Sequence, residues 1–451
     1  MIAIIGGGIT GLAAAYELTA RRAPFQLFEA SPRLGGIIRT EHVDGFTIEA
    51  GPDSILAQKP AAIALCEALG LRNRLITTNV PRTAFVLKDG RLHPLPSPSV
   101  LGIPTTWKGL VTYDLLSPGA RLRLAVEPLI RRRRTVDDES VAAFFRRRFG
   151  DTTVATIAEP LLGGIHAGDI DALSIRSLFP RFIDAEAQHG SVLRAFHRHQ
   201  GAGADGLFRS LLGGMEELVT TIEHRLPANS VHKNAVVEAI APDSGEWRIA
   251  TRSGTTPARA VVLACPAHVA ATLIRPIDAD AAELCKEVPY VSTASIALAW
   301  PRHAIAHPLS GSGFVVARRA NGLRITACTW VSSKWSNRAP SGMTLLRVFI
   351  GGSHDPSAVD VADDALVELA LKELTPILAI KEPPVLTRVY RWRQAGAQHN
   401  VGQIARVSEI ERRLAAHRGI LVAGSGFRSV GIPDCVADGR AAAASACGSM
   451  Q

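Results

Sequence analysis

The N-terminal residues alternate between short apolar runs and one longer segment with helical spacing. Residues 2–6 are apolar apart from a final glycine and predict a short buried strand. Residues 9–20 carry leucine, alanine and tyrosine along one side and predict a helix. Pro24 interrupts the pattern, and Phe25–Glu29 predicts a second strand. The order strand, helix, strand is a βαβ unit, so we expect a parallel sheet here.

Two later regions differ in pattern. Residues 96–200 are rich in arginine, leucine and alanine at helical spacing, which predicts a mostly helical insertion. From about residue 230 short apolar runs alternate with turn residues, which predicts strands. The expected strands are 235–242, 245–254, 258–266, Ser295–Trp300, Gly313–Ala317, Leu323–Trp330, Thr344–Ile350 and Gly419–Ala423, with helices at Asp360–Leu374 and from about Pro433 onward. This mixture predicts an α/β (α+β) fold.

Composition supports a large globular chain without a metal site. Hydrophobic residues make up 47% of the sequence and charged residues 20%, which is enough apolar material for a large core. The six cysteines show no CxxC spacing and no histidine cluster accompanies them, so we expect a reduced, cytoplasmic chain. The first strand begins at residue 2, which leaves no room for a leader, and no apolar run reaches the length of a membrane span.

The net charge of +9 is concentrated in one region. Nine arginines lie between Arg121 and Arg148, against four acidic residues. This cluster has two interpretations: a surface that attracts an anionic membrane or an acidic substrate, giving peripheral membrane association, or an ordinary solvated helix face. Nucleic acid is not expected as a partner, because no aromatic or motif pattern accompanies the arginines.

A glycine fingerprint follows the first strand. Gly6, Gly8 and Gly11 form the pattern G-x-G-x-x-G between strand and helix, and Glu29 ends the second strand 18 residues after Gly11. The first glycine permits the tight turn, the second lets the backbone approach a pyrophosphate, and the third lets helix and strand pack closely. A carboxylate at the end of the second strand can accept ribose hydroxyls. These residues predict a dinucleotide-binding site.

A second motif distinguishes the cofactors. Arg33, Gly35 and Gly36 complete an E-x-x-x-R-x-G-G pattern that starts at Glu29. This pattern resembles the second fingerprint of the flavin-containing amine oxidase superfamily. The resemblance implies non-covalently bound FAD, with Arg33 and the glycine pair along the diphosphate and ribityl chain. NAD enzymes lack this motif.

The residues after the second motif indicate which group within the superfamily the chain resembles. Gly51, Pro52, Asp53 and Ser54 stand in the phrase EAGPDS, which in the superfamily runs beneath the cofactor. The phrase looks like the porphyrinogen oxidases, which aromatise protoporphyrinogen IX or coproporphyrinogen III late in haem synthesis. The resemblance extends over nearly the whole chain. It continues in residues 91–96, 159–169, 173–180, 213–218 and 424–435.

The resemblance also implies further contacts. Toward FAD it implies the backbone near Val236 at the adenine, Trp392, and a closing segment containing Gly424, Gly431, Ile432 and Pro433, where a helix points its amides at the flavin pyrimidine edge. Toward the substrate it implies Arg82, Gly164, His166, Phe314 and Val315. Arg82 is alternatively an exposed loop arginine, and Phe314 and Val315 are alternatively plain core residues. His166 and His399 stand where relatives often have aromatic residues.

The implied activity is a six-electron oxidation of a porphyrinogen in three two-electron rounds, with FAD as hydride acceptor and oxygen as final acceptor. No catalytic acid or base is assigned. The implied partners are the porphyrinogen, molecular oxygen and, for handover of product, a ferrochelatase.

Expected domains are an FAD-binding domain (1–80, 205–275 and 405–451), the helical domain (96–200) and a substrate domain (81–95 and 276–404). The FAD-binding domain is of the Rossmann type, and the substrate domain has a mixed sheet.

Two substrates remain open. Residues 100–105 and 325–330 resemble the bacterial branch that prefers coproporphyrinogen III, and protoporphyrinogen IX is the alternative. The basic residues Arg82, Lys88, Arg91, Arg318 and Arg319 lie in segments that relatives place near the cavity, which suits a substrate with four propionates. An amine oxidase is less favoured, because Arg428–Ile432 lacks the aromatic cage. A carotenoid-type desaturase and a porphyrin-binding flavoprotein without turnover are also less favoured.

Overall fold

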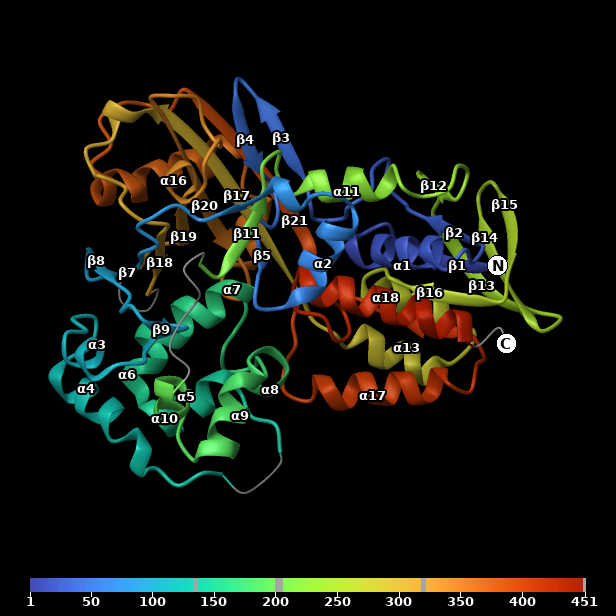
Figure 1. The fold of residues 1–451 in the computed structure, drawn as a ribbon, viewed down its shortest axis with the longest axis horizontal. Helices are drawn as coiled ribbons and strands as arrows, with labels where there is room; N and C mark the ends of the chain where they lie inside the picture. The colour runs from blue at the N-terminus through green and yellow to red at the C-terminus, as the bar shows by residue number, and fades with distance from the viewer. Residues whose placement is uncertain (134–136, 199–205, 318–321, 449–451) are drawn as a thin grey trace.

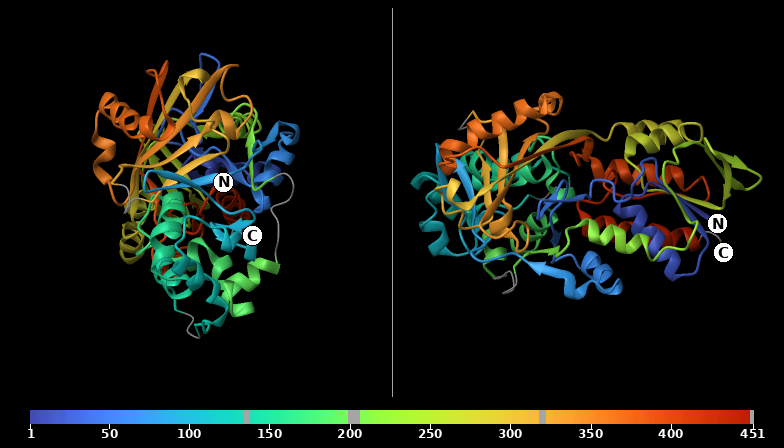
Figure 2. Two further views of the ribbon diagram at one scale, coloured as in Figure 1. Left: turned by 90° about the vertical axis from the view of Figure 1, so that its left-hand side faces the viewer. Right: turned by 90° about the horizontal axis from the view of Figure 1, so that it is seen from above.

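A computed structural model describes residues 1–133, 137–198, 206–317 and 322–448. Figure 1 shows a parallel sheet with its helices on the right, a large mixed sheet at upper left and a group of helices at lower left. Both termini lie at the far right, beside the parallel sheet. The right-hand view in Figure 2 shows the same elongated arrangement from above, and the left-hand view looks along its length.

The parallel sheet is built from segments far apart in the sequence. Its strand order is β12 (Val231–His232), β2 (Phe25–Phe28), β1 (Ile2–Ile5), β16 (Ala260–Leu263) and β22 (Ile420–Val422). Strands β1 and β16 are buried along their whole length, as expected of a sheet covered on both faces. One face packs against α1 (Ile9–Ala20), α2 (Pro60–Ala68), α11 (Glu216–Glu223) and α18 (Ile432–Gly448).

The other face of this sheet is covered by three helices and a small antiparallel sheet. These are α12 (Ala267–Ile274), α13 (Ala279–Lys286), α17 (Gln403–Leu414), β13 (Val237–Asp243), β14 (Glu246–Thr251) and β15 (Gly254–Ala258). The βαβ unit and the helix at 9–20 predicted from the sequence are confirmed. A helix over Gln403–Leu414 was not predicted, because only its buried side is apolar and the rest is charged.

In the described residues the large sheet has seven strands. Each pair of neighbouring strands is antiparallel, except that β7 and β18 run parallel to each other. Its order is β21 (Leu386–Ala397), β17 (Tyr290–Pro301), β20 (Met343–Gly351), β19 (Ile325–Trp330), β18 (Gly313–Val316), β7 (Ala84–Lys88) and β8 (Arg91–Pro94). Helix α16 (Asp363–Leu378) covers one face and shares a core with it, whereas the hairpin β3 (Thr40–Val43) and β4 (Phe46–Glu49) and helix α15 (Val331–Lys334) pack on the other.

The helices at lower left in Figure 1 form the predicted insertion around their own core. They are α3 (Trp107–Val111), α4 (Pro118–Ala125), α5 (Val141–Phe149), α6 (Asp151–Thr153), a π-helix (Val154–Gly163), α7 (Gly164–His166), α8 (Ile175–Leu178), α9 (Pro180–His189) and α10 (Val192–Arg198). The short strands β9 (Ser99–Val100) and β10 (Ile103–Pro104) precede them, and β5 (Ile55–Leu56), β11 (Phe208–Leu211) and β6 (Leu75–Thr77) make a small separate sheet.

Only part of the arginine cluster lies at the surface of the protein. Arg148 is fully buried and pairs with Glu127, and Arg147 pairs with Glu139 and Glu186. Arg123 donates to two main-chain carbonyls of α5. Burial of α5 against its neighbours therefore turns Arg147 and Arg148 inward, whereas Arg131–Arg133 and Arg146 are exposed. Among the described residues, no helix combines the length and apolar character needed to cross a membrane, and no group could hold a metal ion.

Candidate active site

The glycine turn contains two glycines that have no room for a side chain, Gly6 and Gly11, and one that has room, Gly8. A Cβ at Gly11 would lie 1.9 Å from the carbonyl oxygen of Gly6, so α1 can approach β1 only with glycine here. Gly6 has φ +107° and lies against the backbone of Ala264. At Gly8, by contrast, no described atom lies within 4 Å of an added Cβ. The turn therefore leaves room beside Gly8 for a ligand at the start of α1.

Glu29 ties this turn to the end of β2. Its carboxylate accepts hydrogen bonds from the amide of Gly7 at 2.6 Å and from the amide of Ser31 at 2.8 Å. The carbonyl of Glu29 accepts from the amide of Ala235 at 2.9 Å, which brings the neighbouring Val236 to this edge with 45% of its side chain exposed. Glu29 and Val236 are thus brought together, although the sequence separates them widely.

The second motif lies directly on the first. The amide of Gly35 donates to the carbonyl of Gly7 at 2.8 Å, and a Cβ on Gly36 would lie 3.3 Å from Gly8 Cα. The Arg33 guanidinium donates to the carbonyls of Leu34, Gly36 and Ile38. Burial lowers its pKa, opposed by the charge of Glu216. Arg33 therefore shapes its own loop, a role that the motif alone does not reveal.

Asp53 belongs to an internal ion pair. Its carboxylate lies 2.8 Å from Lys334 Nζ and accepts from Ser54 Oγ at 2.8 Å. Burial alone would raise the pKa of Asp53, but the charges of Lys334 and Arg347 hold it well below its usual range. Arg347 also donates to the carbonyl of Gly51 at 2.8 Å. These contacts fasten the Gly51–Ser54 segment to the large sheet and leave Gly51 and Pro52 as its candidates for cofactor contact.

Trp392 fixes the same segment from β21. Its Nε1 donates to the carbonyl of Ala50 at 2.8 Å. The preceding Glu49 is 3% exposed and accepts from the amide of Met215 at 2.8 Å, and Arg338 lies 3.8 Å away. Burial raises the pKa of Glu49 to about 7. The segment is thus held by the large sheet through Trp392 and by the residue before α11, Met215.

The closing segment runs from β22 to the start of α18. Gly424 has φ +109°, and its amide donates to buried Asp438 at 2.7 Å, as does Ser429 Oγ at 3.0 Å. Asp434 in the first turn of α18 pairs with Lys59 at 2.6 Å. A Cβ on Gly431 would touch only Pro433, at 3.9 Å, among the described residues. Ile432 and Pro433 are buried at the helix start.

Two histidines lie where the helical insertion meets the closing segment. The carbonyl of His166 accepts from Gln398 Nε2 at 3.0 Å, and its ring packs edge-on against Phe179. Burial, helped by the charges of His399 and Lys59, lowers the pKa of His166 to about 4. Burial also lowers the pKa of His399, which is 2% exposed. Both imidazoles are therefore neutral hydrogen-bonding groups at neutral pH.

The other predicted substrate residues are dispersed. Gly164 is exposed, and no described atom lies within 4 Å of an added Cβ. Phe314 and Val315 alternate across β18: Val315 contacts the core of the helical insertion, whereas Phe314 is 3% exposed in the core beneath α16. This burial favours the alternative interpretation of Phe314 as a plain core residue, since adjacent strand residues point to opposite faces.

Arg82 is exposed and donates through Nε to Thr78 Oγ1 at 3.0 Å. Arg318 and Arg319 lie outside the described residues. Sequence reasoning missed Lys59, Lys334 and Gln403, which contact the candidate segments. Lys59 could have been found because it follows the EAGPDS motif closely in the sequence. Nothing in the sequence around Lys334 or Gln403 pointed to a role.

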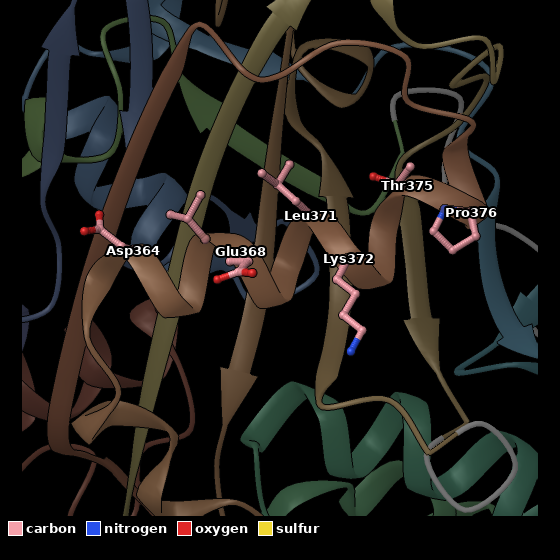
Figure 3. Close-up of a pocket in the computed structure, with 7 residues that line it drawn as sticks. Asp364, Glu368, Leu371, Lys372, Thr375 and Pro376 are labelled. Carbon is pink, nitrogen blue, oxygen red and sulfur yellow. The ribbon is translucent and has the colours of Figure 1, made fainter.

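Two surface hollows lie apart from the glycine turn, although one of them borders the closing segment at Arg428. Figure 3 shows one of about 580 Å³ on the outer face of α16, lined by apolar Val367 and Leu371 and by charged Glu368 and Lys372. Another of about 220 Å³ lies beside the edge strand β22. Helix α16 is on the side of the large sheet remote from the glycine turn in Figure 1, so its hollow is not part of the candidate site.

The residues of the glycine turn fit a dinucleotide. Gly8 and Gly431 leave space that a Cβ would fill, Gly36 packs closely on Gly8, and the apolar residues Ile37 and Val236 are each 45% exposed. Glu29 stands at the strand end where a ribose would bind. These features come together from four separate segments of the chain, and they suit an extended cofactor better than a small ligand.

Comparison with known proteins agrees with a dinucleotide cofactor at this site. The chain matches the family described as flavin containing amine oxidoreductase over residues 9–447. Coproporphyrinogen III oxidase of Bacillus subtilis (strain 168) is 38% identical over 461 residues, covering 99% of this chain and 97% of the relative. Coproporphyrinogen III oxidase of Propionibacterium freudenreichii subsp. freudenreichii is 33% identical, with 97% and 89% covered.

A crystal structure of a protein from Exiguobacterium sp. 255-15, provisionally named protoporphyrinogen oxidase, is 34% identical and superimposes with a TM-score of 0.89 over 98% of each chain. The flavin cofactor and the oxidoreductase class predicted from the motifs are confirmed by these matches. The chain belongs to the family of flavin-containing amine oxidoreductases.

Proposed function

We propose that this protein oxidises a porphyrinogen to the porphyrin with FAD as cofactor and molecular oxygen as acceptor, in haem synthesis. Coproporphyrinogen III is the favoured substrate, and protoporphyrinogen IX is the alternative. One observation carries the proposal: relatives named coproporphyrinogen III oxidase match nearly the whole chain, at up to 38% identity. The name of the Exiguobacterium protein is what keeps protoporphyrinogen IX as the alternative.

The proposed cofactor contacts follow from the geometry of the candidate segments. Gly6, Gly8, Gly11 and Arg33–Gly36 would hold the diphosphate region, and Glu29 and Val236 the adenosine. The Gly51–Pro52 segment, Trp392 and Gly424–Pro433 would surround the flavin. When bound, FAD accepts the hydride that leaves the substrate. The first turn of α18 would present its backbone amides to the pyrimidine edge, where negative charge develops.

The chain's own part in the reaction is to bind, orient and exclude water. Gly164 leaves open space where a macrocycle could lie, and Val315 of β18 contacts the core of the helical insertion that carries Gly164. His166 is neutral, so it can offer a hydrogen bond without attracting a propionate. No acid or base side chain is assigned, since pyrrole protons can leave through the substrate nitrogens or water. The proposed domains are the three expected from the sequence.

Mixing the anaerobic holoenzyme with each porphyrinogen tests the proposal. Loss of flavin absorbance with either substrate supports the activity, and faster bleaching with coproporphyrinogen III supports the preferred substrate. Admission of oxygen should restore the flavin colour and yield fluorescent porphyrin. A porphyrin-binding protein without turnover would not bleach, and an amine oxidase would bleach only with amines. Preference for protoporphyrinogen IX would reverse the choice of substrate alone.

Two measurements test the remaining parts of the proposal. Heat denaturation should release FAD into the supernatant, because the bond to the protein is non-covalent, and colour retained in the pellet would contradict this. Transfer of porphyrin to a ferrochelatase should exceed the rate at which porphyrin dissociates into buffer. Equal rates would exclude direct handover.

We also propose peripheral attachment to anionic membranes through an apolar and basic face on the helical insertion, defined by Trp107, Val111, Leu122 and Leu129. These side chains are 63%, 65%, 66% and 79% exposed. Arg121 donates to the carbonyl of Val111, which joins α4 to α3. Arg131 and Arg132 are exposed close by in the chain. An exposed apolar group beside basic residues is typical of interfacial binding.

A further inference from the structure

His399 contacts two parts of the molecule at once. Its Nε2 lies 2.9 Å from the carbonyl oxygen of Ser425, and its Nδ1 lies 3.0 Å from Ser177 Oγ. A carbonyl oxygen only accepts hydrogen bonds, so the ring proton is assigned to Nε2. In the neutral ring Nδ1 then accepts from the Ser177 hydroxyl. One buried imidazole thereby joins the helical insertion to the closing segment.

Neighbouring contacts make the same connection. The amide of Ser174 donates to the carbonyl of His399 at 2.9 Å, so the insertion holds His399 by main chain and side chain. Gln403, which is 1% exposed, donates through Nε2 to the carbonyls of Phe427 at 2.9 Å and Gly426 at 3.3 Å. Three consecutive carbonyls of the turn, at residues 425–427, are therefore held by the side chains of His399 and Gln403.

The turn is fixed on its other side by Asp438. This carboxylate accepts from the amide of Gly424 and from Ser429 Oγ. Asp438 belongs to α18, which follows the turn directly in the chain, whereas His399 belongs to another segment. Burial lowers the pKa of His399 and keeps the ring neutral, with no additional charge beside the cofactor. Through its bond to Ser177 of α8, the side chain of His399 is therefore a direct link by which a shift of α8 would reach the turn.

We propose that His399 is a positioning residue for the flavin, one that sets the turn Gly424–Ser429 according to the position of the helical insertion. The proposal rests on the flavin cofactor and not on the choice of porphyrinogen. A loosened turn would bind FAD less tightly and would support the reduced form less well than the oxidised form. Both effects can be read without any substrate, so a failed activity assay leaves this test intact.

Three variants separate the two hydrogen bonds. His399→Phe keeps a ring of similar size and removes both bonds. His399→Gln restores a donor toward Ser425. Ser177→Ala removes only the hydroxyl. His303→Phe is the matched control, because His303 has an exposed side chain at the far end of the large sheet.

We expect His399→Phe to weaken FAD binding to the apoprotein by about tenfold, the worth of one strong net hydrogen bond. Its flavin midpoint potential should fall, His399→Gln should restore both quantities, and Ser177→Ala should lie between. Wild-type affinity and potential in His399→Phe would overturn the proposal. So would a His399→Gln variant as weak as His399→Phe. If His399→Phe does not fold, an unchanged potential in Ser177→Ala overturns it.

Discussion

Arg148 and Glu127 form an ion pair inside the helical insertion, with both side chains at 0% exposure. Glu127 also accepts from Ser191 Oγ at 2.5 Å and from the amide of Val192 at 3.0 Å. Arg148 in turn donates to the carbonyls of Ile130 and Gly190. The pair therefore closes the ends of several short helices whose apolar contacts alone are small.

Arg148→Ala should destabilise the protein by about 3–5 kcal/mol, because it leaves Glu127 buried and without its charge partner. Arg146→Ala is the matched control. Arg146 lies on the same helix but is 50% exposed, so its loss should change the free energy of unfolding by about 0.5 kcal/mol or less. Urea unfolding of both variants measures the difference. Equal stability of the two would show that the buried pair contributes little.

The glycine turn offers a paired test of fold against cofactor. Gly11→Val should abolish FAD binding and lower stability by about 1–3 kcal/mol or more, since the new side chain would overlap the Gly6 carbonyl. Gly8→Val should lose FAD but keep its thermal stability as apoprotein. Gly8 has φ −67°, which any residue adopts, and its Cβ would point into open space. Stoichiometric FAD in either variant would contradict the assigned site.

Glu49 should make stability depend on pH. Its pKa is raised from 4.5 to about 7 in the folded protein, so the folded state keeps a proton that the unfolded chain releases. Stability contributed by this proton is therefore present below pH 4.5 and is lost as pH rises from there to about 7. The expected slope is about 1.4 kcal/mol per pH unit within that window. His166, whose pKa is lowered to about 4, adds a slope of the opposite sign over part of this range in any variant that keeps it. Denaturant unfolding of the apoprotein should therefore be read as the difference between the wild type and Glu49→Gln, which should fall by about 1.4 kcal/mol per pH unit as pH rises from 4.5 to about 7.

Vesicle sedimentation tests the apolar and basic face. The wild-type protein should pellet with anionic vesicles at low salt and stay in solution at high salt, because salt screens the basic residues. Leu129→Glu should abolish pelleting, whereas Arg146→Glu, outside this face, should not. Absence of pelleting at low salt would favour the solvated-face interpretation of the arginines.

The sequence predicted the local elements well wherever apolar spacing and glycine turns coincide. The predicted helix at 9–20 and the strand Gly313–Val316 were found within a residue, because burial on both faces leaves little freedom. Strand β21 was not predicted, because it alternates polar and apolar residues irregularly and is rich in arginine. Its identity is decided by pairing with β17, a contact that local pattern does not contain.

The candidate site divides in the same way. Gly8, Gly11 and Glu29 could be named because their roles follow from the backbone of a βαβ unit. For Phe314 the sequence left substrate contact and core packing both open, since a strand pattern gives alternation but not which face meets the ligand. The role of Asp53 could not be foreseen either, because its partner Lys334 is 281 residues away and reaches it only after two sheets have packed.

The strand order of the parallel sheet has a consequence for synthesis. Strand β1 and helix α1 are made long before β22 and α18, which complete their layers. A nascent chain on the ribosome must therefore keep an apolar helix surface uncovered until β22 and α18 have been translated, and the complete cofactor site can form only afterwards. Because the termini lie on the same side of the molecule in Figure 1, a circular permutant that begins before β22 would present the closing segment early and shorten this exposed period.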